Sequence, residues 1–194
     1  MNTTTLTLTK SDLERIASTL GSRWNMRGAS QSLTDGSFAT EKVFFSTSTA
    51  TVTLSASLVD VLIGENPDEV VSINIQEDPE EVKIASARGL LYFQFKDEVV
   101  RSVSVVRDVT ERYVGEECTW TLTADRGLVF EFESGMLAIC TGGDFTTDFF
   151  IATAQSNETL VIPDFRQLWE STIEERYETT RQLIPVADLL TESR

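Results

Sequence analysis

Apolar and polar residues alternate with a period of two through the middle of the chain, which predicts β-strands. The clearest stretch is residues 118–140, where three alternating runs are separated by Asp125-Arg126-Gly127 and by Ser134-Gly135. Glycine ends each short connection, as tight hairpin loops favour. The pattern predicts a three-stranded antiparallel meander, around which we expect the rest of the fold to be organised.

The lengths of the two loops predict the register of this meander. A three-residue loop with Gly127 at positive φ keeps the apolar faces of both strands on one side of the sheet. A two-residue second loop continues the same alternation. We therefore expect two rows of facing side chains, one of Trp120, Phe132 and Leu137 and the other of Leu122, Phe130 and Ile139.

The same register separates the two cysteines, Cys118 and Cys140. They fall on opposite faces of the outer strands, about 9–10 Å apart across two strand spacings. A disulfide tolerates a Cα separation of only about 7 Å. The sequence predicts two free thiols, which fits a reducing, cytoplasmic compartment.

Shorter runs of the same kind predict further strands. Residues 43–54 are rich in β-branched side chains and predict a long strand or a hairpin, and residues 58–63 and 71–75 continue the pattern. Residues 149–154 predict a strand after a turn at residues 142–144.

A hairpin is expected between residues 91 and 109. The run from Leu91 to Phe95 and the valine-rich run of residues 99–109 flank Lys96-Asp97, which we interpret as the turn. Residues 111–117 are polar and are expected to link this hairpin to the meander.

Two helices have clear start and stop signals. Thr9 or Ser11 can cap the first, an apolar stripe follows at helical spacing, and Gly21 ends it. Asp78 can cap the second, Pro79 suits its first position, and Gly89 can end it.

A third helix is expected near the end of the chain. Pro163 opens a segment with apolar residues at helical spacing, Tyr177 to Gln182 extend it, and Pro185 stops it. Together these elements predict one α+β domain over residues 1–194. Its sheet would be mostly antiparallel, with about six to nine strands, flanked by an N-terminal and a C-terminal helix.

Charge is distributed unevenly along the chain. The net charge is −15, and residues 1–60 carry five acids and five bases, so the whole excess follows residue 60. Such a field repels nucleic acid and anionic membranes and accelerates encounter with a basic protein. The alternative is that the charge serves solubility alone.

Two groups of acids are therefore candidates for binding a basic partner. Seven acids lie between Glu65 and Glu81 without a base, although the start of the second helix explains part of this group, because acids there favour the helix dipole. The second group lies in the expected C-terminal helix. The candidate partner-binding residues are Asp78, Glu80 and Glu81, and Glu170, Glu174 and Glu175.

Catalytic chemistry has weak support in the sequence. The chain has no histidine, which removes the usual general base and imidazole metal ligands, and no base is available to activate Cys140. Carboxylates remain, and Asp144 with Asp148, or residues 131 and 133, are the pairs to consider for a metal-dependent reaction. We expect no enzymatic activity, no metal and no cofactor.

One loose resemblance concerns residues 98–176. A helix, a β-rich middle with Trp-x-Leu, Gly-Leu-Val-Phe and Leu-Ala-Ile strands, and an acidic end are similar to small bacterial immunity proteins that neutralise toxins. The favoured hypothesis is an acidic protein that masks a basic partner, such as an immunity protein or inhibitor. The alternatives are a chaperone or adaptor for an exported client and a carboxylate enzyme that uses a metal.

Overall fold

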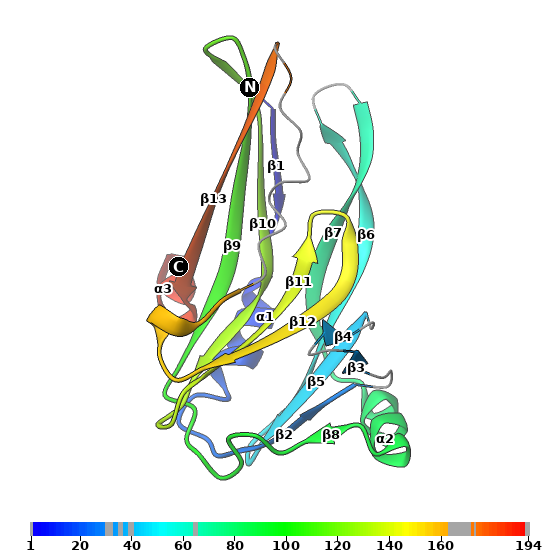
Figure 1. The fold of residues 1–194 in the computed structure, drawn as a ribbon, viewed down its shortest axis with the longest axis vertical. Helices are drawn as coiled ribbons and strands as arrows, with labels where there is room; N and C mark the ends of the chain where they lie inside the picture. The colour runs from blue at the N-terminus through cyan, green and yellow to red at the C-terminus, as the bar shows by residue number, and fades with distance from the viewer. Residues whose placement is uncertain are drawn as a thin grey trace.

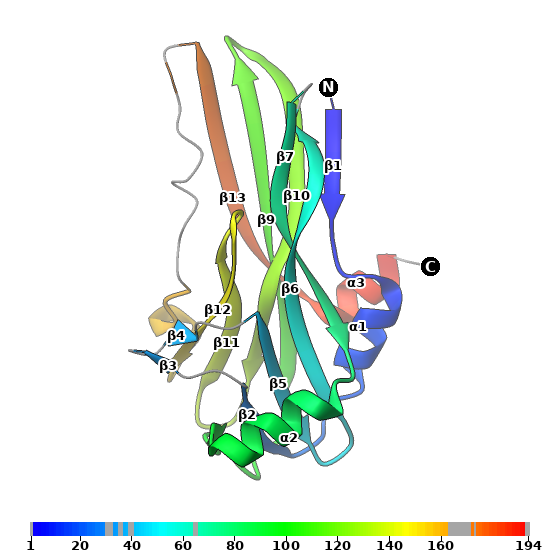
Figure 2. The ribbon, with the colours of Figure 1, turned by 90° about the vertical axis from the view of Figure 1, so that its right-hand side faces the viewer.

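Long strands in two sheets account for most of the fold (Figure 1). The computed structural model describes residues 2–29, 33–34, 37–38, 41–63, 66–162, 172 and 174–192. An eight-stranded and a five-stranded sheet extend along the long axis, and the helices cover only small parts of them (Figures 1 and 2). The prediction of a mostly antiparallel sheet is confirmed, but the short helices bring the fold closer to a mainly β class than to α+β.

The first sheet contains the region that the sequence singled out. Its order is β13 (Glu175–Pro185), β9 (Ser102–Val114), β10 (Glu117–Glu131), β11 (Met136–Gly143), β12 (Thr146–Ala154), β4 (Ser37–Phe38) and β3 (Leu33–Thr34). β1 (Asn2–Leu6) also belongs to it and pairs with β10 in parallel, which the sequence analysis did not predict. The neighbours in the main order pair antiparallel.

The second sheet is antiparallel throughout its described strands. Its order is β7 (Asn66–Gln76), β6 (Thr51–Ile63), β5 (Lys42–Thr47), β2 (Trp24–Gly28) and β8 (Leu91–Tyr92). The hairpin alternative for residues 43–54 is therefore confirmed, because β5 and β6 pair across it.

Local signals predicted the start of the first helix and both ends of the second correctly, whereas the first helix ends at Ala17, before the predicted Gly21. Thr9 caps α1 (Lys10–Ala17), and the side chain of Asp12 returns to the backbone of Thr9 to complete a capping box. Asp78 caps α2 (Pro79–Arg88), and Gly89 ends it at a φ of 69°. These contacts involve residues within three or four positions of each other, so the sequence alone specifies them.

The predicted C-terminal helix is wrong where it can be compared. Residues 163–171 and 173 lie outside the described part of the chain, but Tyr177 to Gln182 belong to strand β13. The helix α3 (Val186–Glu192) begins directly after Pro185. Proline is tolerated at the end of an edge strand, where its missing N–H costs no ladder hydrogen bond. A single 3₁₀ turn, η1 (Asn157–Thr159), follows β12.

The first turn of the predicted meander is instead a bulge inside one long strand. β10 runs straight through Asp125-Arg126-Gly127 and pairs with β9 over nearly its whole length. Asp125 faces Arg107 and Gly127 faces Val106, so Arg126 is the extra residue. A bulge and a hairpin loop share a preference for glycine, which is why the sequence pattern did not separate them. Here Gly127 is needed because a Cβ would collide with the backbone of Ile139 and Cys140.

The predicted rows of side chains are accordingly wrong in register. Phe130 faces Leu137, and Leu128 faces Ile139, because the connection spans residues 132–135 rather than two residues. The shift is an even number of positions, so these side chains still share one face and join the main core. Trp120 and Leu122 pack in a separate cluster with β6 and β7.

Pairing of residues 91–117 also differs from the prediction. β8 pairs with β2, whereas β9 pairs with β10 and β13, so residues 91–109 are no hairpin. The expected linker at residues 111–117 is the tip of the β9–β10 hairpin, with a turn at Gly115 and Glu116. The strand after residues 142–144 is confirmed as β12.

An aromatic cluster holds the two sheets together at the lower end of the molecule. Trp24 of β2 stacks on Phe45 of β5 at 5.4 Å and meets Phe130 and Phe132 of the first sheet edge-on at 5.1 and 5.2 Å. Val186 and Leu189 of α3 reach the same core. All these side chains are almost completely buried.

Candidate functional site

The acidic residues singled out in the sequence lie at two distant places. Asp78, Glu80 and Glu81 are at the start of α2, at the lower end of Figure 1. Glu174 and Glu175 are at the start of β13, at the upper end (Figure 1). The two groups are therefore not parts of one contact surface.

The acids of α2 have partners within the protein. Asp78 accepts from the backbone N–H of Glu81 at 3.1 Å and forms an ion pair with Lys42 at 2.8 Å. The hydrogen bond from Lys42 holds the pKa of Asp78 below its usual value. Glu80 pairs with Lys83 at 2.5 Å, and Glu81 is 5% exposed. These contacts support the helix, and binding of a partner by the three acids stays a prediction.

The acids near β13 are more open. Glu174 is exposed, while Glu175 pairs with Arg112 at 2.6 Å, which lowers the pKa of Glu175. Glu170 lies outside the described residues. A role for these residues in partner binding likewise stays a prediction.

The strand tips around Glu174 carry a larger concentration of acids than the sequence suggested. The tips of β9, β10 and β13 meet because Val114 is in register with both Glu117 and Glu175. The tip of β6 joins them, since the indole N–H of Trp120 donates to the carbonyl oxygen of Leu62 at 3.2 Å. We call this region the acidic end. Its acids are Asp60, Asp68, Glu69, Glu111, Glu116, Glu117, Glu174, Glu175 and Glu178.

Few positive charges balance the acidic end. Among its described residues, the bases are Arg112 and Arg176, which pair with Glu175 and Glu178. Nine acids against two bases leave a net charge of −7 in this region. Two large apolar side chains are exposed beside them, Leu62 at 62% and Val114 at 44%. These residues come from three separate segments, the β6–β7 hairpin, the β9–β10 hairpin and the start of β13, and the first belongs to a different sheet from the others. No local sequence pattern could therefore have found them.

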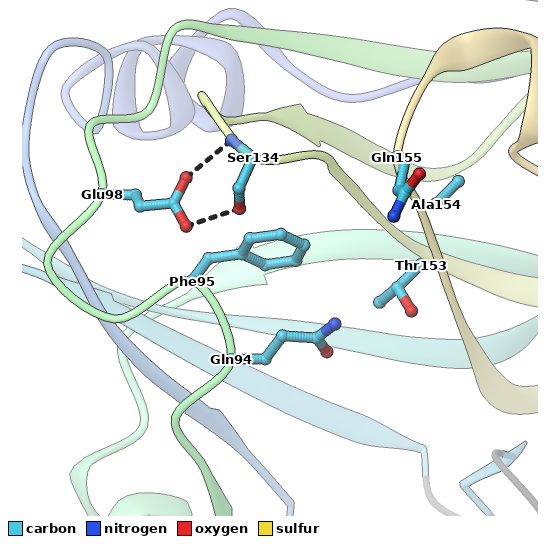
Figure 3. A pocket seen from close by; sticks show the side chains of 7 residues that line it. All are labelled: Gln94, Phe95, Glu98, Ser134, Thr153, Ala154 and Gln155. Atoms are coloured by element: carbon cyan, nitrogen blue, oxygen red, sulfur yellow. Dashed lines mark hydrogen bonds between the residues drawn. The ribbon is translucent and has the colours of Figure 1, made fainter.

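A second candidate site is a cavity at the opposite end of the first sheet. It has a volume of about 390 Å³ and lies between the loop before β9, the β10–β11 connection and the end of β12 (Figure 3). In Figure 3 the ring of Phe95 points from the loop toward the strand that carries Thr153, Ala154 and Gln155. Gln94, Glu98 and Ser134 complete the lining. The volume is at the lower end of the range of small-molecule sites.

The loop that forms one wall of this cavity is strained. Phe95 and Asp97 have φ values of 61° and 67°, which residues with a Cβ rarely adopt. Each costs about 1–3 kcal/mol and persists only where the surroundings impose it. The sequence analysis expected a turn at Lys96-Asp97 but had no signal for a left-handed phenylalanine. Strain of this kind is frequent at binding sites.

Several contacts hold the strained loop in place. The ring of Phe95 stacks on Phe132 with centroids 4.5 Å apart and an interplanar angle of 8°. The carboxylate of Glu98 accepts from both the N–H and the hydroxyl of Ser134, at 2.9 and 2.7 Å (Figure 3). The N–H of Asp97 donates to the carbonyl of Trp24 at 2.7 Å. These contacts hold the loop against the β10–β11 connection and β2.

A larger hollow separates α1 from α2. It has a volume of about 640 Å³, and its walls include Arg15, Ala50, Val52, Asp78 and Val82. Its charged groups are of both signs, and Asp78 there already pairs with Lys42. The hollow therefore has no charge preference for a basic partner.

Buried ion pairs join the strands between the two ends. Arg126, at the bulge, pairs with Asp144 and donates to the carbonyl of Val71 at 2.8 Å, which links the first sheet to β7. Arg181 binds Asp108 through two hydrogen bonds of 2.7 Å. Burial lowers the pKa of Arg126 to about 10, so the side chain remains charged at neutral pH.

Asp144 and Cys140, two of the residues considered for catalysis, are buried. Asp144 is 5% exposed and pairs with Arg126, so its carboxylate does not face an open cleft with Asp148. The prediction of free thiols is confirmed for Cys118 and Cys140. Burial raises the pKa of Cys140 to about 12, so that its thiol is protonated and unreactive at neutral pH.

Within the described ranges, no three acidic or cysteine side chains come together in an arrangement that could hold a metal ion. Over the same part of the chain, every helix is too short or too polar to cross a membrane. The carboxylates of Glu131 and Glu133 have separate partners: Glu131 accepts a hydrogen bond from Ser102 at 2.7 Å, and Glu133 pairs with Arg101 at 3.6 Å.

Comparison with known proteins adds no family to these observations. No protein-family model, no curated protein and no solved structure matches this chain.

Proposed function

We propose that this protein is a non-enzymatic binding protein that docks a basic protein partner on its acidic end and thereby masks it. The single observation that carries the proposal is the net charge of −7 at the acidic end, where the tips of both sheets lie together. An immunity protein or inhibitor that neutralises a toxin would have this property. The proposal moves the docking surface away from α2, whose acids have internal partners.

Charge concentrated in this way acts mainly on encounter. Exposed charges on a surface are screened over about 8 Å at physiological salt, so charges spread over the molecule add little, while a cluster creates a strong local potential. A complementary partner then associates faster, and the rate falls as salt rises. The exposed side chains of Leu62 and Val114 supply apolar contacts once the partner has docked.

Features elsewhere in the chain favour binding over catalysis. The sequence has no histidine, and Cys140 is buried with a pKa of about 12. Asp144 is neutralised by Arg126 in the interior. Asp144 and Cys140 thus have structural roles that account for them.

The test compares two variants of equal net charge. One reverses Asp68, Glu116 and Glu117 to lysine at the acidic end. The matched control reverses Glu77, Glu80 and Glu158, three exposed acids outside that end. A partner is captured from extracts of the native organism on the immobilised wild type, purified, and its association rate measured against ionic strength.

The expected result separates the two variants. The wild type and the control should bind the same basic protein at similar rates, and the acidic-end variant should associate about tenfold or more slowly at about 50 mM salt, with a flatter salt dependence. Equal rates and equal salt slopes for both variants would show that the acidic end serves solubility. Capture of an acidic partner, or of none, would also contradict the proposal.

A further inference from the structure

We propose that the cavity of Figure 3 is a binding site for a neutral saccharide. The site is independent of the acidic end, because β10 separates the two with 15 residues of extended chain. At about 3.3 Å per residue, this strand is about 50 Å long. A ligand in the cavity therefore serves a function separate from docking of the basic partner.

The chemistry of the lining selects a neutral ligand rich in hydroxyl groups. Gln94 and Gln155 each offer an amide that can both donate and accept, and Thr153 offers a hydroxyl that does the same. No lysine or arginine is among the lining residues, so an anion finds no counter-charge there. The only carboxylate, Glu98, already accepts two hydrogen bonds from Ser134. A cation therefore gains little.

The ring of Phe95 supplies the apolar part of the site. A sugar ring has hydroxyls around its rim and C–H groups on its faces, so it can pack on an aromatic ring while its rim meets amides and hydroxyls. Phe95 lies beside Gln94 in the lining, and its ring points toward the strand of Thr153 (Figure 3). Its stacking on Phe132 and the strained backbone fix it before a ligand arrives. Such preorganisation reduces the entropy lost on binding.

A second cavity extends the site beyond one sugar ring. It has a volume of about 440 Å³ and shares Gln155 with the first. Its lining includes the small polar side chains of Ser102, Ser104 and Asn157 and three charged groups. The charged groups have partners, since Arg101 pairs with Glu133 at 3.6 Å and Glu131 accepts a hydrogen bond from Ser102 at 2.7 Å. Gln155 lies where the two cavities meet, so we infer that the ligand is a saccharide of at least two rings.

The experiment follows the side-chain amides of Gln94 and Gln155 by ¹H–¹⁵N NMR. Cellobiose, maltose and diacetylchitobiose are added to about 20 mM, well above the millimolar affinity common for small ligands, with glucose as the single-ring comparison. At least one disaccharide should shift both amides in a saturable way and bind more tightly than glucose. Both glutamines flank the cavity and can be replaced without opening the core.

Matched variants make the test decisive. Gln155→Ala should weaken binding of that disaccharide about tenfold, the loss expected for a hydrogen-bonding side chain shared by both cavities. Lys96→Ala, an exposed change in the same turn but outside the lining, should leave the affinity unchanged. Absence of shifts with every sugar, or equal weakening by both variants, would overturn the proposal. So would shifts caused only by an uncharged peptide such as acetyl-Gly-Ser-Gly-amide, which would identify a peptide site.

Discussion

Arg126 offers the sharpest test of how the two sheets are joined. Its side chain is 1% exposed, and that of its partner Asp144 is 7% exposed. Arg126 also donates to the carbonyl of Val71 on the other sheet. Replacement by methionine keeps the apolar stem but removes the cation, so a buried carboxylate and a carbonyl both lose a donor.

The structure sets the size of the expected effect. Breaking a buried ion pair on one side costs about 3–5 kcal/mol in the free energy of unfolding, because the remaining carboxylate loses the cation with which it pairs. Adding Asp144→Asn removes that charge, and the double variant should recover to a cost of about 1–3 kcal/mol, the range for unsatisfied neutral polar groups. Arg176→Met is the control, because its pair with Glu178 is about half exposed and contributes less than about 1 kcal/mol.

Urea unfolding followed by far-ultraviolet circular dichroism measures all four proteins. Wild type and Arg176→Met should be the most stable, the double variant less stable, and Arg126→Met the least stable. A cost for Arg126→Met no larger than that for Arg176→Met would show that the buried pair contributes nothing. A double variant as unstable as the single one would show that the cost comes from lost hydrogen bonds of Arg126, such as the one to the carbonyl of Val71, and not from the charge left on Asp144.

Three further outcomes are expected. Gly127→Ala should lower the free energy of unfolding by about 1–3 kcal/mol, measured in urea, because the added methyl group meets the backbone of Cys140. The native protein at pH 8 should react with one equivalent of a thiol reagent through the partly exposed Cys118, and with two after denaturation, because burial raises the pKa of Cys140 to about 12. Asp78→Asn should destabilise the protein at pH 7, and its difference from wild type should shrink progressively as pH falls below about 4. The hydrogen bond from Lys42 lowers the pKa of Asp78 in the folded state, so this stabilisation is lost when the carboxylate protonates. A difference in the free energy of unfolding between wild type and Asp78→Asn that stays the same from pH 7 to well below pH 4 would contradict the last prediction.

Local contacts explain which parts of the fold were predictable. The caps of α1 and α2 depend on residues within a turn of each other, and Thr9, Asp78 and Gly89 were assigned correctly. The strand alternation around Phe130 also identified a buried face correctly. Each of these features depends on the types and spacing of a few neighbouring residues, which the sequence shows directly.

Features that depend on distant pairing were beyond the sequence pattern. Whether Asp125-Arg126-Gly127 forms a turn or a bulge depends on β9, which continues beside it for 13 residues. In β13, Tyr177, Thr179 and Arg181 alternate with exposed residues at a period of two, but the acidic and polar outer positions also suit a helix surface. The acidic end could not be predicted either, because Asp68 and Glu117 meet only when both sheets are assembled.

The parallel pairing of β1 with β10 has a consequence for the order of folding. Asn2 faces Trp120, so a strand near the start of the chain pairs with one more than a hundred residues away in the sequence. The backbone N–H of Leu8 likewise depends on the carboxylate of Asp125 at 2.8 Å. Closing a loop of this size is entropically costly before any contact offsets it, and such topologies fold slowly. We therefore expect residues 2–8 to dock only after β10 has formed in the first sheet.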